Sequence, residues 1–311
     1  MSEELVKDIV LDDDMFELLP EEEKNSEFIA MESKTFLQDA WRKFKANKAA
    51  MIGLSFMVIM LIGSILIPMF SPYEYDAQDL SIKNLNPCWE HPLGTDKLGR
   101  DILVRIMYGG RVSLSIGVAT AAINLFIGII YGGISGYVGG RTDMIMMRII
   151  DIIYSVPSLL YVVIILMIFG NSLGSMMFAI CLTSWIGMAR QVRAQVLSLK
   201  EMEFALAAKV IGASDMRILM RHLVTNAIGP IIVTLTMMIP SAIFTEAYLS
   251  MLGIGLDPTI PSWGKLANDV RSLAFTYPIQ VVWPTLVICL TVLSLNFIGD
   301  GLADAFDINK R

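Results

Sequence analysis

Charged side chains are scarce in this chain of 311 residues. They make up 17% of the sequence, hydrophobic residues make up 55%, and the mean hydropathy is +0.61. A typical soluble domain is about one quarter charged. The shortage of charge therefore argues against a soluble globular protein and indicates a chain that lies largely within a membrane.

Cysteine and histidine are also rare, which limits the chemistry that the chain can perform. Cys88, Cys181 and Cys289 show no metal-binding or redox spacing, so no structural disulfide is expected. The two histidines, His91 and His222, are too far apart in the sequence for an evident zinc site. There is no phosphate-binding loop (G-x-x-x-x-G-K followed by Ser or Thr) and no catalytic ordering of serine, histidine and carboxylate residues. We therefore expect no enzymatic activity, and any nucleotide energy must come from a partner.

No cleavable signal peptide is expected, because the first 35 residues are acidic and lack a compact apolar core. Residues 1–34 hold 12 acidic and three basic residues, a local charge of −9, which leaves +3 of the net −6 for the other 277 residues. Such a composition is typical of a mobile, solvated segment. We interpret residues 1–34 as an acidic cytoplasmic tail, with a specific binding arm as the alternative.

Residues 35–48 connect this tail to the first apolar run. Helical periodicity places apolar residues such as Trp41 and Phe44 on one face and the basic residues on the others. This predicts an interfacial amphipathic helix that lies against anionic membrane lipid. An ordinary juxtamembrane basic cluster is the alternative interpretation.

Six apolar segments approach the length of about 20 residues that a membrane-spanning helix needs. They are residues 49–70, 112–135, 145–169, 173–189, 228–252 and 279–299. We predict an all-α membrane protein with six transmembrane helices. Its expected parts are, in order, the tail (1–34), the interfacial helix (35–48), the first transmembrane helix (49–70), an external loop (71–111), a core with five transmembrane helices (112–304) and a cytoplasmic C-terminus (305–311).

The distribution of lysine and arginine predicts the orientation, because cytoplasmic loops carry the excess of these residues. With the N-terminus in the cytoplasm, 17 of the 24 basic residues lie inside. The seven outside are Lys83, Lys97, Arg100, Arg105, Arg111, Lys265 and Arg271. Both termini and residues 190–227 are then cytoplasmic.

Ionisable residues within membrane spans are costly and face the protein interior or a wet cavity. Arg148 and Asp151 are three residues apart on one helical face, which predicts a local structural ion pair. Glu246 has no neighbouring base, so we expect it to pair with Arg271 or Arg111, and contact with a solute at the outer mouth is the alternative.

Small residues and prolines shape the predicted spans. Gly128 and Gly132 form a face of two small residues four apart, which favours close packing between helices. Pro157 and Pro240 each remove a backbone donor and predict kinks in the third and fifth spans.

A polar, basic stretch from Lys200 to Pro230 interrupts the apolar chain. Its small residues, then Gly212, then a basic run predict a short helix, a tight turn and a second helix. A membrane protein that exposes such a segment in the cytoplasm presents it to a soluble partner. We therefore interpret it as a docking element.

Four stretches of this sequence resemble the dipeptide/oligopeptide permease family of ABC importers, and within it the C-type transmembrane subunit. They are HPLGTDKLGRDILVRIMYGGRVSLSIG (91–117), RIIDIIYSVPSLL (148–160), WIGMARQVRAQVLSLKEMEFALAAKVIGAS (185–214) and TEAYLSMLGIGLDPTIPSWG (245–264). The resemblance runs from about Trp41 to the C-terminus. It implies the type I ABC importer permease fold, with a cytoplasmic coupling helix between the fourth and fifth transmembrane helices.

The family's coupling motif reads Glu-Ala-Ala, three residues, then Gly. Here Ala207, Ala208 and Gly212 match, but Leu206 occupies the position of the Glu. Docking on the ATPase is therefore expected to depend on shape more than on that charge. The candidate coupling residues are Glu203, Ala207, Ala208, Gly212, Ala213, Ser214 and Arg217.

The resemblance also implies that spans two to five line a translocation path together with their equivalents in a partner. Candidate polar residues of this path are Thr120, Asn124, Thr236, Ser241 and Glu246. Hydroxyl groups in helices often bond back to their own backbone, which is the alternative role for the threonines and the serine.

The implied partners are a second homologous permease and two P-loop ATPase subunits, with ATP and Mg bound by those ATPases and no cofactor bound by this chain. An extracytoplasmic substrate-binding protein is expected to contact residues 71–111 and 253–278. Membrane lipid is a further partner and nucleic acid is not. The implied location is the cell membrane of a bacterium or archaeon.

The resulting hypothesis is a permease subunit of an ATP-driven importer of di- or oligopeptides that works by alternating access. Nickel, glutathione or another small solute are alternatives within the family. An ATPase-independent channel or transporter is a second class, and a membrane-embedded enzyme or a sensor is a third. Nothing in these residues alone selects the solute.

Overall fold

The computed structural model describes residues 35–257 and 259–306. The predictions for the tail at 1–34 and for residues 307–311 lie outside this range. The chain divides into two compact units, residues 1–39 and 40–311, and the membrane fold belongs to the second.

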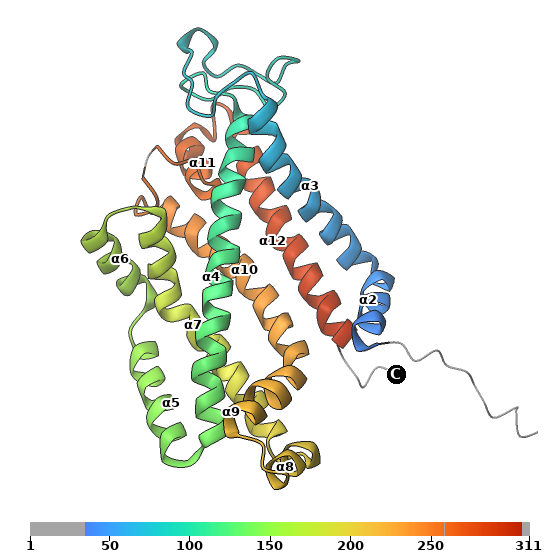
Figure 1. Cartoon of the computed structure of the whole chain (residues 1–311). Coiled ribbons are helices and arrows are strands. Elements are labelled where there is room, and N and C mark those ends of the chain that lie inside the picture. The colour runs from blue at the N-terminus through green and yellow to red at the C-terminus, as the bar shows by residue number, and fades with distance from the viewer. Residues whose placement is uncertain (1–34, 258, 307–311) are drawn as a thin grey trace, which may run out of the picture. The chain divides into compact units, whose positions relative to one another are not determined.

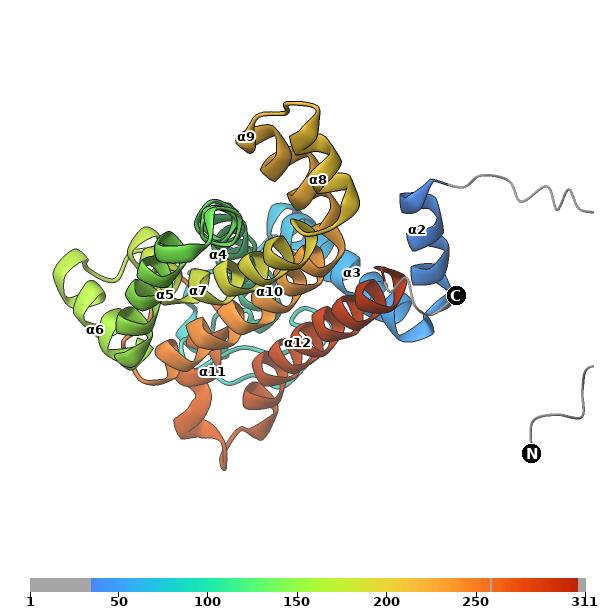
Figure 2. The same ribbon diagram turned by 90° about the horizontal axis from the view of Figure 1, so that it is seen from below.

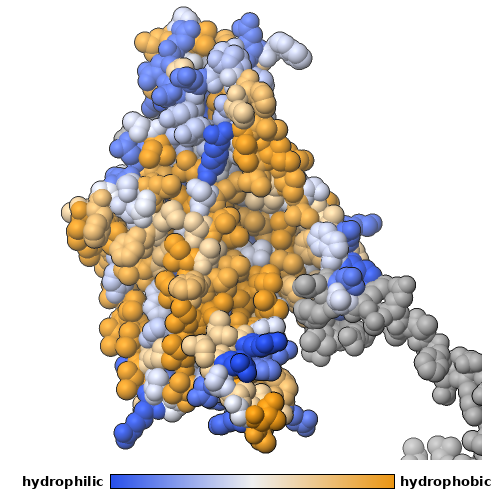
Figure 3. Space-filling view, viewed as in Figure 1, coloured by the Kyte–Doolittle hydropathy of each residue, from blue (hydrophilic) through white to orange (hydrophobic). Residues whose placement is uncertain are grey.

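Five helices are long and apolar enough to cross a membrane (Figure 1): α3 (Lys48–Phe70), α4 (Ile102–Val138), α7 (Leu173–Leu199), α10 (Ile228–Met251) and α12 (Pro278–Phe306). The pair α5 (Gly140–Ser155) and α6 (Ser158–Phe169) adds a sixth span if its two helices are counted together. The shorter elements are α2 (Phe36–Ala46), η3 (Leu80–Ile82), α8 (Glu203–Val210), α9 (Asp215–Arg217), the π-helical η4 (Ile218–Val224), α11 (Trp263–Val270) and η5 (Arg271–Leu273). The expectation of an all-α, multi-pass membrane protein is confirmed. Figure 3 shows apolar side chains covering the flanks of the long helices, with polar side chains gathered at the two ends.

Two predicted boundaries change in the structure. The helix expected from residue 112 begins ten residues earlier, at Ile102, because the Asp101 side chain accepts a hydrogen bond from the Val104 amide and caps the first turn. The loop between α3 and α4 is therefore 71–101. The third predicted span is two helices, because Pro157 lies between α5 and α6 and their axes differ by 77°. Pro240, by contrast, lies inside the unbroken α10.

Glycines allow α4 and α7 to approach closely, as their spacing predicts. A Cβ atom on Gly128 would overlap the Met188 side chain, and one on Gly132 would overlap the carbonyl oxygen of Ala189. Helix α10 packs most extensively against α12 and α4. These helices form the frame on which the functional residues are placed.

The helix α2 has the amphipathic character expected of residues 35–48. Ala40 and Phe44 are buried in a small cluster with Ala50 and Ala305. Trp41 is half exposed, and Lys45 Nζ lies 5.0 Å from the centre of its ring. An apolar face buried on α3 and α12 and a basic, aromatic face left open are typical of a helix at a lipid interface.

A proline in the last turn of α3 leaves one carbonyl without its usual partner. Pro68 has no N–H, so the Ser64 carbonyl oxygen, four residues earlier, loses its helical hydrogen bond. Arg111 from α4 replaces it, because Nε donates to the Ser64 carbonyl oxygen at 2.6 Å and Nη2 donates to that of Ile65 at 2.8 Å. The Arg111 guanidinium also lies 5.4 Å from the centre of the Tyr108 ring. This side chain therefore ties α3 to α4.

We expect Arg111→Met to lower the free energy of unfolding by about 1–3 kcal/mol, because it leaves a backbone carbonyl unpaired. Thermal denaturation of the purified protein in detergent measures this loss. In a Pro68→Ala background the restored amide can bond the Ser64 carbonyl, so Arg111→Met should cost less. Equal costs in the two backgrounds would show that Arg111 does not replace the missing hydrogen bond.

Candidate functional site

A cavity of about 320 Å³ lies between α4, α7 and α10. Thr120, Asn124 and Ser241 line it, so the structure brings three of the five path candidates together. Thr236 and Glu246 are not among its lining residues. The full lining is Thr120, Asn124, Ile180, Ser184, Gly187, Gln191, Thr234, Met238, Ser241, Ala242 and Thr245.

The residues of α7 and α10 that line the cavity follow a helical repeat. On α10, Thr234, Met238, Ser241 and Thr245 have spacings of four, three and four, which is one face of a helix. Ile180, Ser184, Gly187 and Gln191 repeat the same spacing on α7. A search for polar residues at that spacing would have found Ser184, Gln191, Thr234 and Thr245 from the sequence.

The hydroxyl groups of this lining donate to their own helices, as the alternative role for these residues proposed. Thr234 Oγ1 donates to the Pro230 carbonyl oxygen at 2.9 Å, and Ser241 Oγ donates to that of Met237 at 3.0 Å. Thr245 Oγ1 donates to the Ser241 carbonyl oxygen at 2.8 Å. Thr236, outside the lining, does the same to Ile232 at 2.9 Å. Each hydroxyl still has lone pairs that can accept a hydrogen bond.

Asn124 links α4 to α7 across the edge of the cavity. Its Nδ2 donates to Ser184 Oγ at 2.7 Å, and Ser184 Oγ donates in turn to the Ile180 carbonyl oxygen at 2.8 Å. Because the single Ser184 proton is used in that bond, the Asn124 amide must present Nδ2 to Ser184. Within the described part of the chain, Asn124 Oδ1 and Thr120 Oγ1 have no hydrogen-bond partner, although both residues are 1% exposed.

Glu246 does not form the ion pair that we expected from the sequence. Its carboxylate is fully buried and accepts hydrogen bonds from Ser113 of α4 at 3.2 Å, Ser250 of α10 at 2.8 Å and Ser262, just before α11, at 2.6 Å. Arg111, one of the two expected partners, is bonded to the α3 backbone instead.

The first turn of α11 explains how a buried carboxylate is held without a cation. Ser262 caps this helix by accepting from the Lys265 amide at 3.2 Å, and the Trp263 amide donates to Ser113 Oγ at 3.1 Å. The same two hydroxyls donate to Glu246. The positive end of the α11 dipole is therefore directed at the carboxylate through Ser113 and Ser262. Glu246 joins α4, α10 and α11, and it is a structural centre rather than a lining residue of the cavity.

The predicted Arg148–Asp151 pair is also replaced by another. Asp151 bonds to Arg190 Nη2 of α7 at 3.0 Å, and the Arg190 guanidinium lies 5.0 Å from the centre of the Tyr154 ring. Arg148 is exposed and precedes Asp151, which is the weaker order for a charge pair on a helix. Helix α7 packs beside α5 and offers the better partner.

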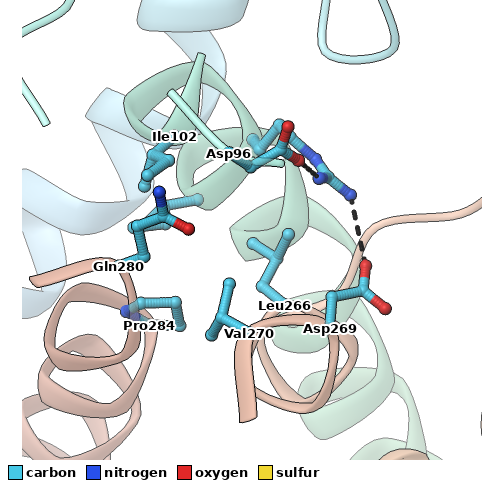
Figure 4. A pocket seen from close by; sticks show the side chains of 9 residues that line it. Asp96, Ile102, Leu266, Asp269, Val270, Gln280 and Pro284 are labelled. Carbon is cyan, nitrogen blue, oxygen red and sulfur yellow. Dashed lines mark hydrogen bonds and ion pairs between the residues drawn. The ribbon is translucent and has the colours of Figure 1, made fainter. Parts of the chain in front are cut away.

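The loop between α3 and α4 is joined to the helices by a buried arginine (Figure 4). Arg105 pairs with Asp96 from the loop and with Asp269 from α11 at 3.6 Å, beside a cavity of about 20 Å³. Burial favours a higher pKa for Asp96, but Arg100 and Arg105 outweigh it and hold the pKa of that carboxyl below its usual range. The acidic and basic residues of HPLGTDKLGRD thus fix the shape of the loop.

The segment expected to dock on a partner forms α8, a turn at Gly212, and the short α9 followed by η4. Figures 1 and 2 show α8 and α9 standing out at one end of the long helices. Gly212 has φ +84°, a conformation that favours glycine, and it lets the Ala213 amide reach the Ala208 carbonyl oxygen at 3.0 Å. A helix, a tight turn and a second helical segment are what the sequence predicts here.

Ala208 faces the interior of its own subunit, which corrects its expected role. It is 4% exposed, as is Ala205, and both pack with Leu219 and Leu223 of η4. These small residues allow α8 to lie close to its own chain rather than to a partner. Among the other predicted coupling residues, Ala213 is half-buried, and those with exposed side chains or surfaces are Glu203, Ala207, Gly212, Ser214 and Arg217.

The outward tip of this segment is apolar. Val210 is 87% exposed and Ile211 is 83% exposed. Hydrogen bonds tie the chain on either side of this tip to the end of α4, because Tyr137 Oη donates to Asp215 at 2.7 Å and Lys200 Nζ donates to the Gly136 carbonyl oxygen at 3.0 Å. Two adjacent branched apolar side chains are thus exposed at the C-terminal end of α8.

Comparison with known proteins gives consistent matches. Residues 124–311 match the family described as "Binding-protein-dependent transport system inner membrane component", and residues 35–87 match the "N-terminal TM domain of oligopeptide transport permease C". The chain is 45% identical to the oligopeptide transport system permease protein OppC of Bacillus subtilis, covering 96% of this chain and 97% of the relative. It is 42% identical to the dipeptide transport system permease protein DppC of the same organism, covering 96% and 94%. A chain of the MetNI methionine ABC transporter, solved in inward-facing conformations, is similar in fold at 18% identity and TM-score 0.51, covering 66% of this chain and 96% of that one.

Proposed function

Because the chain belongs to the family of binding-protein-dependent transport system inner membrane components, we propose that it is the C-type transmembrane subunit of an ATP-driven peptide importer. The observation that carries the proposal is the 45% identity over nearly the whole length of an oligopeptide permease subunit. The cavity between α4, α7 and α10 supports it, since a neutral lining with hydroxyl and amide groups among apolar side chains suits a translocation path.

The chain supplies half of this path, and a second homologous permease supplies the other half. Two P-loop ATPase subunits, which bind ATP and Mg, dock on the segment from α8 to η4. An extracytoplasmic binding protein delivers the solute at the loop 71–101 and at the region around α11. Each partner shifts the equilibrium between conformations only by binding them unequally.

We place the end of the molecule that carries α8 and α9 in the cytoplasm. The excess of basic residues on that side supports this orientation, because 17 of the 24 lysines and arginines then lie inside. The half-exposed Trp41 and Lys45 of α2 lie at the surface of the same leaflet, where they contact anionic lipid. The chain itself performs no catalysis and binds no cofactor.

Reconstitution with the partner subunits and the binding protein tests this function. We expect di- to pentapeptides to stimulate ATP hydrolysis severalfold in the presence of the binding protein, because the loaded binding protein favours the conformation in which the ATPases close. Stimulation by nickel or glutathione instead of peptides would assign one of the alternative solutes of the family. Transport by the isolated chain without ATPases would assign the channel class.

A further inference from the structure

The cavity between α4, α7 and α10 offers hydrogen-bond acceptors and has no ionisable residue in its lining. We propose that Thr234, Ser241 and Thr245 form a ladder that recognises the backbone N–H groups of a passing peptide. This inference rests on the proposed function and adds which chemical group of the solute the path recognises.

The direction of each hydroxyl group supports an accepting role. All three ladder hydroxyls use their only proton on the carbonyl oxygen four residues earlier, at 2.8–3.0 Å. Ser184, across the cavity on α7, does so as well at 2.8 Å. A hydroxyl bound in this way can still accept from a ligand but has no proton left to donate. These four hydroxyls therefore favour a solute that brings donors.

Asn124 extends the same preference into the edge of the cavity. Its Nδ2 is fixed by Ser184, which leaves Oδ1 as an acceptor without a partner in the described part of the chain. A buried acceptor without a partner costs free energy. A peptide N–H, or the opening of α4 from α7, would remove that cost.

The length of the ladder fits a short peptide. Thr234 and Thr245 are eleven residues apart, which is about 16 Å along a helix. An extended peptide advances about 3.3–3.6 Å per residue, so about five residues match this length. The apolar lining between the rungs, from Ile180, Met238 and Ala242, leaves room for varied side chains without selecting a charge.

The test compares an amide with an ester. The complete transporter, in proteoliposomes with saturating binding protein, is given either trialanine or the analogue in which the peptide N–H of the central residue is replaced by an ester oxygen. The two solutes share their termini and side chains. The ratio of their initial uptake rates is then compared between wild type and variants, so that the preference of the binding protein cancels.

We expect Thr234→Val with Ser241→Ala and Thr245→Val to reduce the amide-to-ester ratio about fivefold, because a neutral hydrogen bond changes an equilibrium by about 2- to 10-fold. Ser241→Ala alone changes an exposed side chain, folds normally, and should reduce the ratio about twofold. Thr236→Val is the matched control, since Thr236 makes the same backbone bond but does not line the cavity.

Two results would overturn the ladder. One is a ratio that stays at the wild-type value in both Ser241→Ala and the triple variant, and the other is an equal loss in Thr236→Val. If wild type neither imports trialanine nor shows peptide-stimulated ATP hydrolysis, the proposed function fails and this inference fails with it. That outcome is distinguishable, because it appears before any variant is made.

Discussion

Glu246→Ala is expected to destabilise the protein by about 3 kcal/mol, the larger of the two strongest effects that we predict. The carboxylate is fully buried and accepts from Ser113, Ser250 and Ser262. Hydrogen bonds to a charged group contribute about 1.5–3 kcal/mol each, and their losses are not additive because the three hydroxyls share one acceptor. The loss should release α11 from α4 and α10. Thermal denaturation of the purified transporter and protease cleavage between residues 252 and 278 measure both consequences.

The serines supply the matched controls for Glu246. Ser250→Ala removes one of the three hydrogen bonds to the carboxylate and should cost about 1.5 kcal/mol, because the other two remain. Ser262→Ala should cost more, since it removes both a bond to the carboxylate and the cap of α11. Glu246→Gln keeps the volume but places an amide donor against hydroxyls that already accept from the backbone of α11, so an intermediate loss is expected. If Glu246→Ala is as stable as Ser250→Ala, the carboxylate does not hold these three helices together.

Replacing both Val210 and Ile211 by aspartate should weaken the affinity for the ATPase subunits by a factor of at least about 100. Both side chains are almost fully exposed, so the change leaves the folded subunit intact, whereas burying two charges in an apolar contact is costly. The expected result is a membrane-inserted chain that pairs with the second permease but co-purifies with no ATPase and shows no peptide-stimulated ATP hydrolysis.

The control for this variant exchanges the two side chains, as Val210→Ile with Ile211→Val. It keeps the apolar area and the β-branched shapes, so ATPase binding should remain close to wild type. Gly212→Trp is a useful third variant, because no described residue other than its two neighbours in sequence has an atom within 4 Å of a Cβ at that position. Any loss of ATPase binding would then come from a clash of the tryptophan with the ATPase or from backbone strain at position 212. It would not come from a clash within the subunit. Normal coupling in the aspartate variant would mean that the tip of α8 is not the docking surface.

The membrane helices could be predicted because hydrophobic length is a local property, but their ends could not. The start of α4 was placed at residue 112 because Arg105, Arg111 and two glycines dilute the hydropathy of its first turns. The cap at Asp101 shows that the helix begins at Ile102. At Pro157 the sequence predicted a kink, whereas the structure has a complete break with a 77° change of direction.

The candidate site was predicted only in part for a different reason. Asn124 and Ser241 were chosen because they are polar within apolar spans, and both line the cavity. Ala208 was assigned to a partner surface because its motif matched, yet it is buried against η4. Motif position identifies the segment, while the rotation of each helix decides which of its residues face a neighbour, a cavity or solvent.

The sequence by itself determined the apolar helices, the membrane setting, the turn at Gly212 and the family, because these depend on runs of neighbouring residues. Only the tertiary structure decided the partners of the polar groups. Ser113 reaches Glu246 across 133 residues of chain, and Arg190 reaches Asp151 across 39. Such pairs depend on the axial position and rotation of packed helices. The summed contacts of many side chains fix this position and rotation, and no local sequence pattern encodes them.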